Sequence, residues 1–194
     1  MLRPVIFGLL LAVPATPAAL VLTTPFTQDS IVFYDPPSPP ENIDDFVAQS
    51  DAVIVVSVID QANWEHPSSR FPLTEYKAHI VEVLKGDPRL PSTVPTPSTP
   101  MIQFLEIAGE RRTARGLART KNAASLKRND KAIVFLQWAQ SVERFMLLGG
   151  AHAAYIETPN GMRPANPDSA LAKRWNGRSK DDLIRTLKAA SRKK

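Results

Sequence analysis

The chain contains no cysteine. It therefore has no disulfides, no thiolate ligands for a metal, no thiol nucleophile and no cysteine that could carry a lipid. Nucleophile-elbow, phosphate-loop and HExxH patterns are also absent. The histidines, His66, His79 and His152, stand singly, whereas a zinc site or a catalytic triad needs several ligands or partners. We therefore expect no enzyme activity, no metal and no cofactor.

Basic side chains are scarce in the first half of the chain and acidic ones in the second. Residues 1–100 carry five basic and eleven acidic side chains, net −6, and residues 101–194 carry nineteen and eight, net +11. A basic half of this size favours an anionic neighbour such as membrane headgroups, acidic cell-wall polymer or nucleic acid. The alternative is a solvated surface that keeps the protein soluble.

The positive charge is densest over Gly109–Lys131, where eight basic residues face only Glu110 and Asp130. Little apolar periodicity is present to pack this segment, so we predict a mobile, solvent-exposed loop that attracts anionic polymer or lipid headgroups. The alternative is that its cations pair with the acidic first half of the molecule. The candidate contact residues for an anionic surface are Arg111, Arg112, Arg115, Arg119, Lys121, Lys127 and Arg128.

The first residues have the pattern of an export signal over Met1–Leu22. An arginine precedes the apolar run Val5–Val13, and small residues and prolines follow at Pro14–Ala19. We therefore expect an exported protein, periplasmic or extracellular. The alternative is an uncleaved membrane anchor over Val5–Leu22, which is about long enough to span a bilayer, although its prolines argue against a straight helix.

Composition then divides the remaining chain into three parts. Residues 23–40 are an extended, proline-rich lead-in, residues 41–167 hold the strand-rich domain, and residues 168–194 form a helical, basic tail. A short helix is predicted over Glu41–Ser50, because its acidic residues lie in the first turns. In the tail, Asp168 is predicted to cap one helix and Ser179 the next.

The strand-rich domain begins with Asp51–Asp60, an apolar run rich in valine and isoleucine that is typical of a strand buried on both faces. Thr74–Gly86 then alternates apolar and polar residues until the phase slips at Val81–Glu82. One extra residue in a strand produces such a slip, so we predict a β-bulge and a bent strand, as a small closed barrel requires. An Asn160-Gly161 hairpin turn is also predicted.

Four more strands follow the same reasoning, over Met101–Ile107, Lys131–Trp138, Arg144–Leu148 and Ala153–Glu157. The predicted fold is a mainly β, five- to six-stranded antiparallel OB-like barrel with a short N-terminal helix and C-terminal helices. Its predicted core consists of Val53 or Ile54, Val56, Val58, Tyr76, Ile80, Phe104, Phe135 and Leu136.

A family resemblance follows from the order of these motifs. Ser50–Val56, then a bent strand ending in Val83–Gly86, then Ala132–Leu136, then Leu148–Gly150, precede an amphipathic terminal helix. This order resembles a large group of exported bacterial proteins of uncharacterised function. Their barrel is similar to the netrin-like module of the tissue inhibitors of metalloproteinases. The resemblance implies an OB-type barrel. It does not imply protease inhibition, because those inhibitors use an N-terminal cysteine to reach the protease metal.

These features together predict a non-catalytic exported or envelope binding module that acts through barrel loops and the basic segment. The expected partner is an envelope protein or an anionic polymer or lipid surface, with no small-molecule cofactor. One alternative is an OB-type nucleic-acid-binding protein, but the export signal and the lack of aromatics interleaved with basic residues oppose it. The other is a protease-inhibitor-like module.

Overall fold

The structure, a computed structural model, describes residues 32–34, 41–65, 71–91, 99–113, 116–120 and 123–192. The predicted export signal and most of the proline-rich lead-in lie outside the described residues. The described strands form one seven-stranded sheet, which contains the barrel, and a separate three-stranded sheet.

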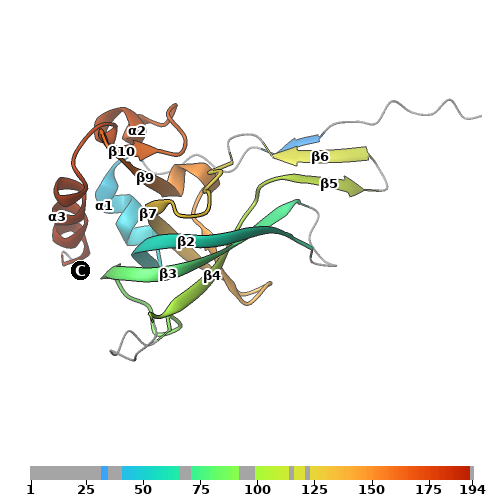
Figure 1. Ribbon diagram of the computed structural model, residues 1–194, viewed down its shortest axis with the longest axis horizontal. Coiled ribbons are helices and arrows are strands. Elements are labelled where there is room, and N and C mark those ends of the chain that lie inside the picture. Colours follow the sequence, from blue (N-terminus) through green and yellow to red (C-terminus); the bar gives the residue numbers. More distant parts are fainter. Residues whose placement is uncertain are drawn as a thin grey trace, which may run out of the picture.

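Five strands close into the barrel (Figure 1). β2 (Ala52–Trp64) pairs antiparallel with β3 (Leu73–Lys85) on one side and with β7 (Lys131–Ala139) on the other. β4 (Met101–Glu106) pairs with β3, and β8 (Arg144–Leu147) joins β4 to β7. The predicted OB-like barrel is thus confirmed.

The closing pair of the barrel departs from the antiparallel arrangement that the sequence predicted. β8 runs parallel to β4, with Phe104 beside Phe145 and Leu105 beside Met146, and antiparallel to β7. Strands that alternate in direction can close a ring only when their number is even. A ring of five strands therefore needs one parallel pair, and here it lies between β4 and β8.

The predicted β-bulge is present in β3. Val55 pairs with Glu82 and Val56 with Ile80, so that Val81 is the extra residue between them. Its side chain is 56% exposed, while Ile80 beside it is buried. The phase slip read from the sequence therefore marks the place where β3 bends around the barrel.

The core fills the barrel and continues under the helices. All the predicted core residues are buried. β2 is buried over most of its first seven residues because both of its faces are covered. α1 (Ile43–Gln49) packs on the barrel through Phe46, whose ring stacks on Phe135 with centroids 4.3 Å apart. Ile43, Phe46 and Val47 form the face that this helix buries.

The end of α1 is held by a lysine from β3. The Lys85 ammonium donates to the carbonyl of Val47 at 2.8 Å and also to those of Ala48 and Ser50. The last carbonyls of a helix lack partners within the helix and carry partial negative charge, so a cation there is favourable. This contact fixes α1 against the end of the bent strand.

The C-terminal elements extend the same sheet and cover it. After a 3₁₀ turn at Gly150–Ala153, β9 (Ala154–Thr158) pairs with β7, and β10 (Gly161–Pro164) pairs with β9. The hairpin turn between them lies at Pro159-Asn160, one residue before the predicted Asn160-Gly161. The helices α2 (Ala170–Trp175) and α3 (Lys180–Ser191) follow. Both helices contribute buried side chains to the barrel's core cluster, namely Leu171, Trp175, Leu183, Leu187 and Ala190.

The caps of these two helices were predicted with one error. Ser179 caps α3 as predicted, and its hydroxyl accepts from the Asp182 amide at 3.2 Å. The cap of α2 is Ser169 instead of Asp168, and its hydroxyl accepts from the Ala172 amide at 2.9 Å. Both residue types are good caps, so local sequence alone does not decide between neighbours.

Candidate binding surfaces

The first candidate surface is a basic hairpin. β5 (Glu110–Thr113) and β6 (Gly116–Thr120) pair antiparallel, and β1 (Val32–Tyr34) adds to β6 in parallel. This small sheet is separate from the barrel sheet, and the hairpin extends from the barrel on the side away from α3 (Figure 1). The prediction of one long loop over Gly109–Lys131 is therefore wrong.

The structure brings some of the predicted anion-binding residues together and separates others. Arg111 and Arg112 lie in β5, and Arg119 lies opposite Glu110 in β6. Arg115 and Lys121 fall outside the described residues. Lys127 and Arg128 are exposed in the turn before β7, and no ion pair among the described residues includes either of them.

The basic residues of the second half pair little with the acidic first half. Among ion pairs between described residues, Lys188 to Glu82 at 2.6 Å is the one that joins the two halves. The others lie within one half, such as Lys180 to Glu157 at 3.0 Å. For the described basic residues, pairing within the molecule therefore accounts for only a small part of the charge.

The chain returns from the hairpin to the barrel and becomes buried again. The Thr120 amide donates to the Gly109 carbonyl at 3.2 Å, which closes the base of the hairpin. Ala124 and Leu126 are then buried in the core, with exposed Ser125 between them at φ 50°. A serine in this left-handed region costs backbone energy, which buried neighbours on both sides offset. The expected mobile loop is thus anchored at its C-terminal part.

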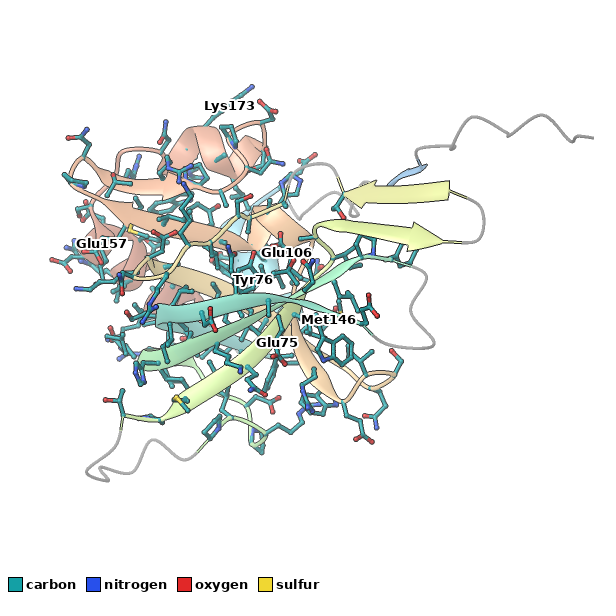
Figure 2. The ribbon with its side chains drawn as sticks, turned by 45° about the vertical axis from the view of Figure 1, so that its right-hand side comes forward. Glu75, Tyr76, Glu106, Met146, Glu157 and Lys173 are labelled. Atoms are coloured by element: carbon teal, nitrogen blue, oxygen red, sulfur yellow. The ribbon has the colours of Figure 1, made fainter. Side chains whose placement is uncertain are left out.

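A buried carboxylate makes that anchor. Glu106, the last residue of β4, is fully buried and accepts two hydrogen bonds. Tyr76 of β3 donates its hydroxyl to Oε2 at 2.8 Å, and the Ala124 amide donates to Oε1 at 2.5 Å. Figure 2 shows Tyr76 and Glu106 close together, and Glu106 lies at the end of β4 from which the chain continues to the hairpin. A buried carboxylate is tolerated only with such partners.

Burial is the largest cause of the pKa shifts of Glu106 and Tyr76. It raises the pKa of Glu106 to about 7, against the opposing effect of the hydrogen bonds from Ala124 and Tyr76. Burial also raises the pKa of Tyr76, and the nearby Glu106 carboxylate adds to that shift. Both side chains are at most 1% exposed, so no substrate reaches them. The pair therefore holds the returning segment in place.

Our reading of the sequence missed Glu106, although a signal for it exists. In β4, Ile102 and Phe104 share the parity of Glu106, and both point into the core. A glutamate in phase with buried residues at the end of a strand predicts a charge that is turned inward and hydrogen-bonded.

The second candidate surface is a groove of about 400 Å³ at the other end of β4. Trp138 and Phe145 meet edge to face at 5.2 Å, and the Arg89 guanidinium lies 5.0 Å from the centre of the Trp138 ring. Arg89 is held by Asp87, with a closest contact of 2.5 Å. The hydrogen bonds from Arg89 lower the pKa of Asp87, and those to Asp87 raise the pKa of Arg89.

The described part of the chain offers neither a metal-binding cluster nor a membrane-spanning helix. It contains no group of three or more histidine, aspartate or glutamate side chains placed to hold a metal ion. None of its helices has both the length and the apolar character needed to cross a bilayer.

Comparison with protein-family models gives no match for this chain, and no curated protein matches it significantly. Its function is therefore inferred from the barrel and its two surfaces.

Proposed function

We propose that the protein is a non-catalytic, exported binding module whose basic hairpin attaches it to an anionic surface of polymer or lipid headgroups. The observation that carries this proposal is the placement of Arg111, Arg112 and Arg119 on a two-stranded arm that extends from the barrel. The export signal predicted from the sequence supports a location where such surfaces occur.

The attachment is electrostatic. A basic side chain near an anionic membrane surface contributes about 1 kcal/mol, and salt screens this attraction within a Debye length. An arm with several arginines can thus bind without recognising a particular sequence or stereochemistry. Its base is fixed by the Thr120–Gly109 hydrogen bond and by the Glu106 contact, so the barrel holds the arm outward.

Vesicle binding tests this function. The parent chain is expected to bind vesicles that contain anionic lipid at least roughly tenfold more tightly at about 10 mM salt than at about 1 M, and to ignore neutral vesicles. A variant with glutamine at the four arginines of residues 110–119 should lose most of this preference. The substituted positions are Arg111, Arg112, Arg115 and Arg119.

A control variant removes the same number of positive charges from the helical side of the molecule. Exposed residues of α2, α3 and the chain after α3 provide it, each changed to glutamine: Lys173, Arg174, Arg185 and Arg192. The proposal requires the control to keep most of the anionic preference. Equal losses in both variants would show that net charge matters and the arm does not.

A further inference from the structure

The groove at the start of β4 borders an unpaired strand edge. β4 pairs with β3 from Met101 to Glu106, but β8 pairs with it only at Phe104 and Leu105. Among the described strands, Met101–Gln103 therefore have a neighbour on one side only. These three residues also line the groove. An open edge of this kind offers backbone hydrogen bonds to another extended chain.

The register shows which backbone groups are offered. The Ile80 amide donates to the Pro100 carbonyl at 2.8 Å, so Pro100 faces β3. In an antiparallel pair, successive residues alternate between facing the partner and facing away. Ile102 therefore also faces β3. The N–H and C=O groups of Met101 and the N–H of Gln103 are directed to the open edge, whereas the Gln103 carbonyl lies on the side of β8, next to Phe145.

The surroundings of the edge are apolar, and besides the paired Arg89 the lining carries one exposed cation and one exposed anion. Met101 is 60% exposed, and Trp138 and Phe145 form the aromatic part of the lining. Arg144 is exposed and takes part in none of the ion pairs between described residues. Glu143 is the acidic residue of the lining. With Arg89 already paired to Asp87, Arg144 is the cation available to an acidic ligand.

This arrangement favours an extended peptide as the ligand over a nucleobase or a sugar. Stacking of a base or sugar needs a free aromatic face, and Arg89 already lies over the Trp138 ring. An extended peptide needs no such face, because strand addition uses the backbone for affinity and alternate side chains for specificity. Its apolar side chains would meet Met101 and the rings, and its acidic ones Arg144.

We propose that Met101–Gln103, with Trp138, Arg144 and Phe145, bind an extended, acidic segment of a partner protein by strand addition to β4. The segment lies where β8 would run if it began three residues earlier along β4. The site is separate from the basic hairpin, and its test stands independently of the vesicle experiment.

The experiment uses the full chain and an array of peptides of roughly eight residues. Acidic residues alternate in them with valine, isoleucine, leucine or phenylalanine, and a matched array carries lysine in place of the acidic residues. The best acidic peptide is then N-methylated at every other residue, in either of the two phases. We expect acidic peptides to be preferred and only one methylation phase to abolish binding.

Two substitutions locate the site. Arg144→Glu should lower the affinity for the acidic peptide roughly tenfold or more, because an attraction between opposite charges becomes a repulsion between like charges. Arg163→Glu makes the same charge change at an exposed position of β10 and should change affinity less than about twofold. In a ¹⁵N-labelled chain, the amides of Met101 and Gln103 should shift on binding. Equal binding of lysine peptides, equal effects of both methylation phases, equal effects of both substitutions, or no binder in the array would each overturn the proposal.

Discussion

The raised pKa of Glu106 predicts that the parent loses stability as the pH rises from about 4.5 to about 7, and replacing Glu106 with glutamine is expected to abolish this loss. Burial raises the pKa of this carboxyl, so the folded state binds the proton more tightly than the unfolded chain does. Its contribution is full below the unfolded pKa and is lost as the pH rises through the folded one. Because the pKa rises from 4.5 in the unfolded chain to about 7 in the folded one, the free energy of unfolding falls by on the order of 3 kcal/mol.

Urea unfolding at several pH values between about 4.5 and 8 measures this effect. Glutamine can still accept from the Ala124 amide and hydrogen-bond Tyr76 without a titrating proton. Glu75→Gln, a change of the residue next to Tyr76, is the matched control and should keep the parent's pH dependence. If the Glu106 variant follows the parent's curve, the carboxyl does not titrate as its burial implies.

Replacing Gly161 with alanine is expected to destabilise the protein by roughly 2–5 kcal/mol, through combined overpacking and backbone strain. A Cβ at this position would lie 2.6 Å from the Gly177 carbonyl oxygen and 2.7 Å from that of Arg178. The backbone there has φ +104°, which side chains rarely adopt. β10 could not give way easily, because the Met162 amide donates to the Arg178 carbonyl at 2.8 Å.

Gly177→Ala separates the two causes. Gly177 also has a positive φ, +76°, but a Cβ there would meet nothing within 4 Å. This variant should therefore show only the conformational cost of about 1–2 kcal/mol. Chemical unfolding of the three proteins gives the comparison. Equal costs for both variants would mean that close packing of β10 against the chain between α2 and α3 does not matter.

The barrel was predictable because its strands carry buried faces. A strand that is covered on both faces needs an apolar run, as in β2, and a bulge needs one extra residue in the alternation, as at Val81. Both features can therefore be seen in the sequence. The hairpin was not predictable in this way. β5 and β6 are at most five residues long and are polar or basic at most positions, so they show no apolar alternation. Their pairing becomes visible only in three dimensions.

The groove was equally hidden in the sequence. Trp138 and Phe145 lie opposite each other in the β7–β8 pair, but Arg89 and Met101 come from other parts of the chain and meet them only because β8 also joins β4. No local spacing links Arg89 or Met101 to these two rings. Glu106 is the opposite case, since its parity in β4 already placed it inside.

Excision of the hairpin tests the proposed function most directly. The Thr120 amide and the Gly109 carbonyl are 3.2 Å apart, so a short glycine-serine link can replace Glu110–Arg119 without moving Ala124 or Leu126. Vesicle binding and urea unfolding are measured for the parent and the excised chain at low and high salt. We predict that the excised chain loses the salt-sensitive binding to anionic vesicles and keeps the parent's unfolding midpoint. Undiminished binding by a folded, excised chain would contradict the role of the hairpin.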